Sequence, residues 1–292
     1  MLKTRRLGIA VLAPAMLCAA CATPDSKPPS VVGSIAAAGL SGAARHPVSA
    51  APSSSAGHGA SRPVAAKLPL AGKTVGIDPG HDGGNFNDAA SIDTMVWNGR
   101  AEETCDTTGT ATASGYTESR FNLSVATYLR ADLIADGARV VMTRTSDHGV
   151  GPCVTTRAQI INQAHADVAI DIHADGGPAN GRGFTVLEPV ADGTNDKVIR
   201  PSMAFGADVR DAMLAYTTMP VSNYYGASGV LERDNLAGLN LTTVPKILIE
   251  CGNMPNPTDA TMLTSPAFQQ QAARALTAAI VAFLTGRTIQ KG

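Results

Sequence analysis

Short apolar runs alternate with longer amphipathic stretches over the last three-quarters of the chain. Apolar runs rich in β-branched residues are typical of buried strands, whereas apolar residues repeated every three or four positions are typical of helices. The predicted strands are Thr74–Asp78, Arg139–Thr143, Val168–Ile172, Gly183–Leu187 and Lys246–Cys251. The predicted helices run from Glu118 to a stop at Gly137 and over Thr156–Ala166, Pro201–Tyr216 and Pro266–Leu284. This alternation predicts a single α/β domain with a central, mostly parallel sheet flanked by helices.

The first quarter of the chain follows neither pattern. Residues 1–22 combine a basic start, a short apolar run and small residues, which is typical of an export signal peptide. Residues 23–69, dominated by Ala, Ser, Gly and Pro, predict a disordered linker. The folded domain is expected over 70–286, followed by a tail at 287–292. We therefore expect an exported protein, periplasmic or secreted in the cell envelope, with Cys21 as a possible lipid anchor and cleavage near Ala22 as the alternative.

Composition and charge exclude some classes of partner. The net charge is −1 and the isoelectric point is about 6.6, so the chain has no basic footprint for nucleic acid. Hydrophobic residues make up 44% of the chain and aromatic residues only 4%, which predicts a core built mainly from aliphatic side chains. We expect a monomer.

The cysteines support export. Cys18 and Cys21 fall in the signal, which leaves three in the domain. Cys105 and Cys153 lie in polar, loop-like stretches, whereas Cys251 closes an apolar strand. A Cys105–Cys153 disulfide with Cys251 as a buried thiol is therefore expected. In the chain-entropy model such a bridge stabilises the fold by about 4 kcal/mol. Three free thiols are the alternative.

Two histidines directly follow predicted strands. His81 directly follows Val-Gly-Ile-Asp-Pro-Gly, and His173 directly follows Asp-Val-Ala-Ile-Asp-Ile. Ligands gather where the strands of an open α/β sheet end, so the pair suggests a metal site that needs a carboxylate to complete it. Glu118 is the best candidate, although a role at its own helix N-terminus is the simpler interpretation. Glu250, at the end of an apolar strand, is costly to bury unless it is paired or functional.

Residues 82–117 form a polar excursion that is far longer than an ordinary connection. It leaves the strand that precedes His81 and returns directly to Glu118, so its body should lie near the site. We expect a functional loop or hairpin that tunes access. An inert surface insertion held by the disulfide is the alternative.

Four separated motifs resemble those of one enzyme family, in order, between Lys73 and Leu284. They are Val-Gly-Ile-Asp-Pro-Gly-His81, Thr-Glu118-Ser-Arg-Phe-Asn-Leu, Asp-Ile-His173-Ala-Asp and Ile-Leu-Ile-Glu250-Cys-Gly-Asn. The chain thus resembles the zinc-dependent N-acetylmuramoyl-L-alanine amidases of type 3. The resemblance implies one zinc ion held by His81, Glu118 and His173, with Glu250 as the catalytic carboxylate. It also implies peptidoglycan or muropeptides as the substrate, cleaved between N-acetylmuramic acid and L-alanine.

Other residues carry weaker expectations. Asp78 and Asp175 are candidates to orient the ligand histidines, with a turn-forming role as the alternative. Arg182 and Asn240 are candidates to bind a peptide carboxylate or amide. His148 and His165 are expected on the surface.

Two functions from other classes remain open at this stage. A non-catalytic wall-binding module would usually lack a metal ligand or the catalytic carboxylate, and this chain has all four residues. A zinc carboxypeptidase acting within the stem peptide would use similar groups, but its ligands are expected as a close His-x-x-Glu pair. Here 37 residues separate His81 from Glu118 (118 − 81 = 37).

Overall fold

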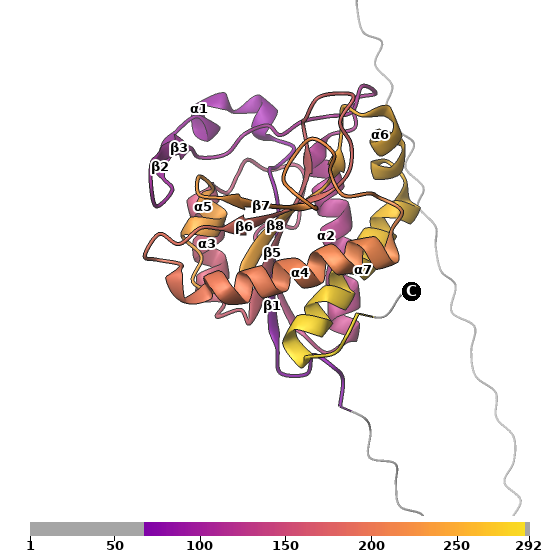
Figure 1. Cartoon of the computed structure of the whole chain (residues 1–292). Coiled ribbons are helices and arrows are strands. Elements are labelled where there is room, and N and C mark those ends of the chain that lie inside the picture. The colour runs from indigo at the N-terminus through magenta and orange to yellow at the C-terminus, as the bar shows by residue number, and fades with distance from the viewer. Residues whose placement is uncertain (1–66, 290–292) are drawn as a thin grey trace, which may run out of the picture. The chain divides into compact units, whose positions relative to one another are not determined.

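The computed structural model describes residues 67–289 (Figure 1). The predicted signal peptide, including Cys21, and the linker up to residue 66 lie outside the described residues. A six-stranded sheet runs through the fold in the order β4-β1-β5-β8-β6-β7. Its strands are β1 (Thr74–Pro79), β4 (Arg139–Met142), β5 (Val168–Asp175), β6 (Thr185–Pro189), β7 (Val230–Arg233) and β8 (Lys246–Asn253).

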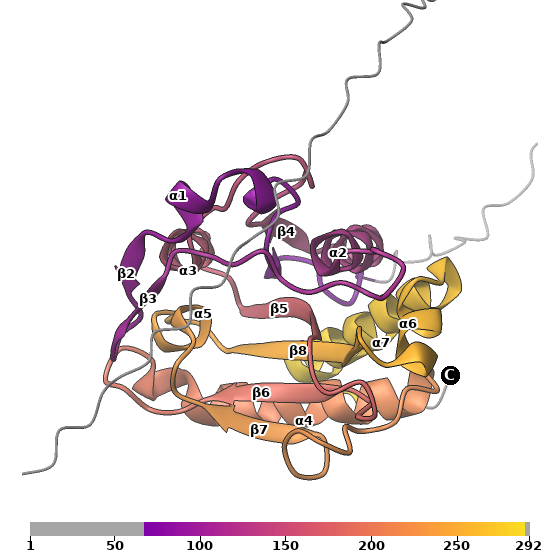
Figure 2. The same ribbon diagram turned by 90° about the horizontal axis from the view of Figure 1, so that it is seen from above.

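The pairing of the strands is mostly parallel. β1 pairs in parallel with both β4 and β5, β5 with β8, and β6 with β7. Only the β6–β8 pair within this sheet is antiparallel. Figure 2 shows β5, β8, β6 and β7 side by side. The prediction of a single α/β domain with a mostly parallel sheet is confirmed.

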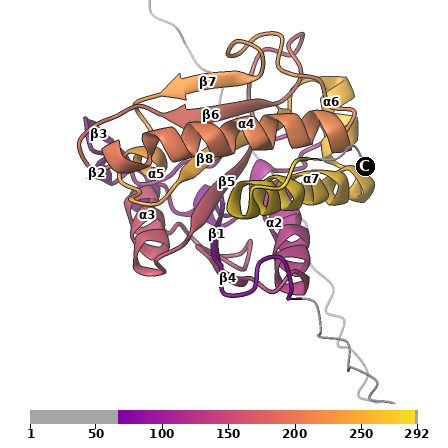
Figure 3. The same cartoon turned by 60° about the horizontal axis from the view of Figure 1, so that its bottom comes forward.

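Helices cover both faces of the sheet. The long helices α2 (Glu118–Ala135), α4 (Ile199–Tyr216) and α7 (Pro266–Thr285) form one layer, and Figure 3 shows α4 and α7 beside each other across the sheet. The opposite face carries α3 (Val154–Gln163) and the short α5 (Ala237–Asn240). Among the described helices, none combines the length and apolarity needed to span a bilayer.

Sequence pattern explains the boundaries of α2. Thr117 caps the first turn by accepting a hydrogen bond from the backbone N–H of Arg120. Gly137 follows the last turn with a φ of 91°, a conformation that costs a glycine little. Four apolar residues one turn apart are fully buried against the sheet and α7: Phe121, Val125, Leu129 and Leu133.

The predicted elements all form, with shifted ends. β5 continues past Ile172 to Asp175, because its polar end still pairs with β8. Six further α-helices and strands were not predicted from the sequence. They are α1 (Ala89–Ile92), the hairpin strands β2 (Met95–Trp97) and β3 (Glu102–Thr104), β7, α5, and α6 (Pro257–Leu263). Each is short, and β2, β3 and β7 lack a fully buried side chain, so no hydrophobic period marks them.

Side-chain alternation gives the sheet an apolar face, which packs in the main core, and a polar face, which carries charged and imidazole side chains. Val75 and Ile77 of β1 point into the main core with α2, whereas Gly76 faces Ile161 of α3. In β5 and β8 the same alternation puts the apolar residues Ile170, Ile172, Ile247 and Ile249 into that core. The intervening residues therefore turn toward α3 and α5, and these include Asp171, His173, Lys246 and Glu250.

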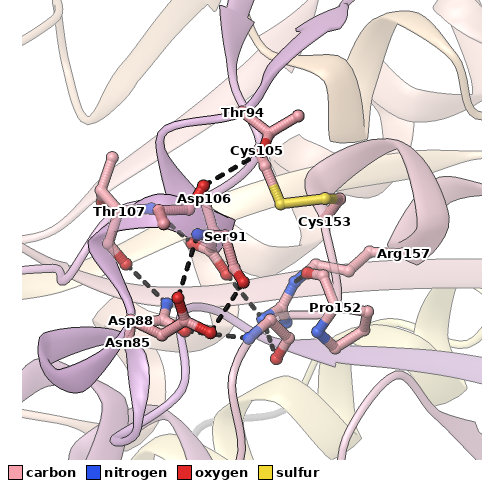
Figure 4. Close-up of a disulfide and its surroundings, with 12 residues drawn as sticks. Asn85, Asp88, Ser91, Thr94, Cys105, Asp106, Thr107, Pro152, Cys153 and Arg157 are labelled. Carbon is pink, nitrogen blue, oxygen red and sulfur yellow. Dashed lines mark hydrogen bonds and ion pairs between the residues drawn. A yellow bond between two sulfur atoms is a disulfide. The ribbon is translucent and has the colours of Figure 1, made fainter.

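The excursion of residues 82–117 packs over this polar face. A disulfide joins Cys105, just after β3, to Cys153 at the start of α3 (Figure 4), and Cys251 is a buried free thiol. Both cysteine predictions are confirmed. The hairpin is also tied to α5, because the backbone N–H of Ala237 donates to Glu103 Oε1 at 3.1 Å. The prediction that the 82–117 excursion controls access to the site stays a prediction.

Candidate active site

Three side chains from separate elements meet at the carboxyl end of the sheet. His81 follows β1, Glu118 begins α2, and His173 lies near the end of β5. Glu118 Oε1 lies 2.8 Å from His173 Nδ1 and 3.3 Å from His81 Nε2. One ligand atom from each residue falls within 4.8 Å of the other two. These three residues, hereafter the metal triad, therefore form a compact donor set of two imidazoles and one carboxylate.

The turn that presents His81 is strained and is held by buried arginines. His81 has a φ of 56°, in the left-handed region that residues other than glycine rarely occupy. Arg144 donates to the carbonyl oxygens of Pro79 and Gly80 at 2.9 and 3.0 Å. Arg157 donates to the carbonyl oxygens of Pro79 and His81 at 2.8 and 3.0 Å. Because charged donors fix three successive carbonyls, the imidazole is held in place before any ligand binds.

Asp106 orients the His81 ring. Its Oδ1 lies 3.1 Å from His81 Nδ1, and its Oδ2 accepts from Arg157 Nη2 at 3.1 Å (Figure 4 shows Asp106 and Arg157). The Nε2 atom of His81 is thereby left to face Glu118. The expectation that Asp78 and Asp175 orient the histidines is wrong. Asp78 pairs with Arg157 and Lys246, and Asp175 accepts from the Gly176 N–H and the Tyr224 hydroxyl.

Glu118 points into the site rather than capping its helix. Its Oε2 accepts from the backbone N–H of Thr110 at 2.9 Å, and its Oε1 from that of Ala174 at 3.3 Å. Burial raises the pKa of this carboxyl, but the two histidines outweigh burial and hold it well below its ordinary value. Burial lowers the pKa of His81, but Glu118 and Asp106 raise it to about 10 in the metal-free protein. The site is thus negative enough to favour a cation.

Two glycines make room for the triad. A Cβ atom on Gly80 would lie 2.1 Å from the His173 ring. A Cβ on Gly109 would lie 2.7 Å from the His81 ring and 2.8 Å from Glu118 Oε2. Only a residue without a side chain allows the backbone to approach the ligands this closely.

Glu250 faces the triad from the next strand. It is the register partner of His173 in the parallel β5–β8 pair, so both side chains project from the same face. Its Oε2 atom is buried and has no hydrogen-bond partner among the described residues. Burial raises the pKa of Glu250, and the Glu118 and Asp175 carboxylates raise it further. An unpaired carboxyl of this kind is rare in a folded interior and indicates a functional group.

A buried charge cluster lies beneath the site, in the next layer of the same strands. Lys246 Nζ lies 2.9 Å from Asp171 Oδ1 and 3.2 Å from Asp78 Oδ2. Arg157 Nη1 lies 3.0 Å from Asp78 Oδ1. Burial raises the pKa of Asp78, but these two cations outweigh it and hold the pKa low, whereas burial and Asp78 raise the pKa of Asp171. The cluster joins the neighbouring strands β1, β5 and β8 to one another.

An open cleft of about 360 Å³ contains the metal triad and Glu250. Thr107, Gly109, Tyr225 and Arg233 contribute to its walls. A second cavity of about 210 Å³ shares His81 and His173 with the cleft and reaches down to Asp171 of the charge cluster. Two adjoining cavities therefore share His81 and His173 of the triad.

Neither weaker candidate for substrate binding lines the cleft. Arg182 pairs with the buried Asp259 at 3.0 Å, and Asn240 is buried, donating to the carbonyl oxygens of Asn98 and Asp234. The expectation for Asn240 is wrong, because a polar, glycine-rich setting also suits residues that fasten loops. The Arg182 side chain is one-third exposed outside the cleft, and its role in binding stays a prediction. His148 and His165 are exposed, as expected.

Sequence analysis did not identify three residues that position the His81 turn and ring: Asp106, Arg144 and Arg157. The predicted disulfide contained a signal for Asp106, because it brings the residue after Cys105 to the start of α3, where Arg157 lies in the first turn. Arg144 follows the strand β4, which the order of strands places beside β1. Without that order its contact with the turn of His81 could not be derived.

Comparisons with known proteins agree with the geometry. Residues 75–282 match the family model described as N-acetylmuramoyl-L-alanine amidase. The chain is 42% identical over 216 residues to the N-acetylmuramoyl-L-alanine amidase Rv3717 of Mycobacterium tuberculosis, covering 74% of this chain and 88% of the relative. The crystal structure of the amidase Ami1 from Mycobacterium smegmatis matches with a TM-score of 0.70 at 40% identity, covering 75% of this chain and 99% of the other. Ami1 from Mycobacterium abscessus, in its apo form, gives the same TM-score and identity, covering 74% and 100%. The chain therefore belongs to the N-acetylmuramoyl-L-alanine amidase family and is an amide hydrolase of that class.

Proposed function

We propose that one zinc ion held by His81, Glu118 and His173, together with Glu250 as the catalytic carboxylate, performs the family's reaction. The bond cleaved is the amide between the lactyl group of N-acetylmuramic acid and L-alanine of the peptidoglycan stem peptide. The observation that carries the proposal is the compact triad facing a buried, unpartnered carboxyl across one cleft.

The donor set suits zinc. Two imidazole nitrogens and one carboxylate oxygen are a common ligand set of catalytic zinc, and three protein ligands leave a coordination position open. The His81–Asp106 contact is the type of outer hydrogen bond that fixes the tautomer of a ligand histidine. The negative charges that raise the pKa of His81 in the metal-free protein also favour a divalent cation.

The residues of the chain would divide the chemistry as follows. When bound, zinc supplies a Lewis acid that polarises the scissile carbonyl and makes a water molecule more acidic. Glu250 accepts a proton from the attacking water and returns it to the nitrogen of L-alanine as the amide bond breaks. Asp106, Arg144 and Arg157 hold the His81 turn during turnover.

The proposed location is the cell envelope. The substrate of the family lies outside the membrane, and residues 1–22 read as an export signal. The proposal includes a monomeric state and two alternatives for the signal, which are lipid attachment at Cys21 and ordinary cleavage near Ala22.

Metal analysis of the purified full chain tests the ligand set. The wild type should contain about one zinc ion per chain and lose activity to a chelator. His81→Ala and His173→Ala should lose the metal, whereas His148→Ala, which removes an exposed imidazole, should keep it. Equal zinc content in all four proteins would contradict the ligand assignment.

A further inference from the structure

Arg233 lines the cleft and has no carboxylate at ion-pair distance among the described residues, although its charge acts on Glu250 from further away. It ends β7 and is the only Arg or Lys side chain among the residues that line the cleft of the metal triad and Glu250. Other arginines near the site, Arg144, Arg157 and Arg182, each pair with an aspartate. Arg233 forms no ion pair with any carboxylate of residues 67–289. A guanidinium in this setting is able to receive an anionic ligand.

Arg233 has unused hydrogen-bond donors that could bind such a ligand. Its Nε donates to Asn235 Oδ1 at 2.8 Å, and its Nη1 donates to the hydroxyl of Tyr225. A guanidinium has five N–H donors. Within the described part of the chain, Nη2 and the second hydrogen of Nη1 have no acceptor, and these are the donors that bind a carboxylate in the bidentate geometry.

Neighbouring aromatic rings hold the guanidinium in place. Its Cζ lies 6.0 Å from the centroid of the Tyr225 ring, and Tyr225 stacks on Tyr224 with centroids 6.2 Å apart. The Tyr224 hydroxyl donates to Asp175 Oδ2 at 2.7 Å, two residues beyond His173. Arg233 is therefore fixed relative to the strand that carries a metal ligand, so little ordering entropy is lost on binding.

The charges of the cleft restrict where an anion can bind. Three carboxylates line it, those of Glu118, Asp175 and Glu250, and each repels a substrate carboxylate. Apart from the proposed metal and its histidines, Arg233 is the one basic side chain among the lining residues that can offset this repulsion. A substrate carboxylate that enters the cleft without binding the metal is therefore best placed at Arg233.

Resting on the proposed function, we propose that Arg233 binds the free α-carboxylate of the second stem-peptide residue. In peptidoglycan that residue is D-glutamate, which continues the peptide through its γ-carboxyl and leaves the α-carboxylate free unless it is amidated. One residue of extended chain spans about 3.5 Å, so this group lies close enough to the scissile bond to share the cleft with it. Arg233 is thus a specificity-determining residue that selects D-glutamate over its α-amide, D-isoglutamine.

Two muramyl dipeptides that differ only in this group provide the test. The zinc-loaded wild type should cleave the D-glutamate substrate with a kcat/KM about 10- to 100-fold above that of the D-isoglutamine substrate, as expected for a hydrogen bond to a charged group. Arg233→Gln should lose this preference, mainly through a higher KM for the acid. Arg233→Lys should retain part of it. Arg200→Gln, which removes an exposed arginine of α4, should leave it unchanged.

A second measurement is independent of turnover. Calorimetry with the product dipeptides L-alanyl-D-glutamate and L-alanyl-D-isoglutamine should give the same ratio of affinities, lost in Arg233→Gln. Zinc content and melting temperature of each variant control for the fold.

The possible contrary results are distinct. If the wild type cleaves both substrates equally, or if Arg233→Gln slows both equally and shifts the pH profile, the inference is wrong, and the second result would make Arg233 a modulator of Glu250. If the zinc-loaded wild type cleaves neither, the proposed function itself fails, and the inference with it.

Discussion

Asp106 connects the metal triad to the rest of the fold. One of its carboxylate oxygens meets His81 and the other meets Arg157, which in turn pairs with Asp78 of the charge cluster. Burial raises the pKa of Asp106, but His81 and Arg157 outweigh burial, so the carboxyl stays ionised. The orientation of one ligand ring thus depends on a residue in the middle of a long polar excursion.

Substituting Asp106 should weaken metal binding without removing a ligand. Asp106→Asn keeps the size of the side chain but loses its charge, so zinc affinity should fall about 10- to 100-fold. Competition with a zinc-sensitive dye would measure this. Asp88→Asn, which alters the cap of α1, should bind zinc like the wild type. If the two variants show the same affinity, Asp106 does not hold the ligand.

Residue types were easier to predict than their partners. His81, Glu118 and His173 stand at the ends of periodic elements, so pattern alone could place them near one another, and the structure groups them. The partner of the His81 ring could not be read in this way. Asp78 is nearer in sequence, but alternation along β1 directs its side chain toward Lys246 and Arg157, whereas Asp106 arrives through the disulfide-bonded excursion.

At the scale of elements, three neighbouring strands depend on one buried lysine. Lys246 of β8 lies between Asp78 of β1 and Asp171 of β5, and its side chain is 1% exposed. Removing one partner of such a cluster leaves uncompensated buried charge, which costs far more than the loss of a surface pair.

Lys246→Met should therefore lower the free energy of unfolding by about 3–5 kcal/mol at neutral pH. Denaturant unfolding of the full chain, followed by circular dichroism, would measure this. Lys73→Met breaks the half-exposed pair with Asp167 and should cost no more than about 1 kcal/mol. Similar costs for the two variants would contradict a structural role for the cluster.

A second element-scale prediction concerns the paired strands β6 and β7. Glu188 and Glu232 are register partners, and burial followed by the Glu232 charge raises the pKa of Glu188 to about 7. The folded pKa lies above the ordinary value of 4.5, so the stability that Glu188 contributes is complete below pH 4.5 and is lost as the pH rises through 7.

Glu188→Gln should remove this dependence. Its melting temperature should fall less between pH 5 and pH 8 than that of the wild type, because the amide stays neutral throughout. Glu102→Gln, on the exposed strand β3, provides the control. Parallel pH profiles for wild type and Glu188→Gln would show that Glu188 titrates normally.

Long periodic elements were predictable and short ones were not. The helix from Glu118 and the strand at Lys246 each carry several buried residues at a regular period, which fixes their type. β7 carries only four residues, none fully buried, and forms because β6 offers it a parallel edge. A tertiary pairing of this kind leaves no local signal.

At the scale of the whole molecule, the order of the strands assembles the site. β1 and β5 are neighbours and so are β5 and β8, so residues 81, 173 and 250 emerge together at one end of the sheet. The excursion between β1 and α2 returns to the same end of the sheet at Glu118. Its residues also line both cavities. A sequence of alternating elements predicts parallel strands, but not which strands are adjacent, so the cleft itself could not be predicted.

The most direct test of the account is the identity of the new end groups. Zinc-loaded wild type and zinc-loaded Glu250→Gln are incubated with purified muramyl peptide, and the products are identified by mass spectrometry. The wild type should release a peptide that begins with a free L-alanine amine, together with N-acetylmuramic acid bearing a free lactyl carboxyl. Glu250→Gln should form these products about 10²- to 10⁴-fold more slowly at equal zinc content. Products that retain L-alanine on N-acetylmuramic acid, or equal rates for the two proteins, would contradict the account.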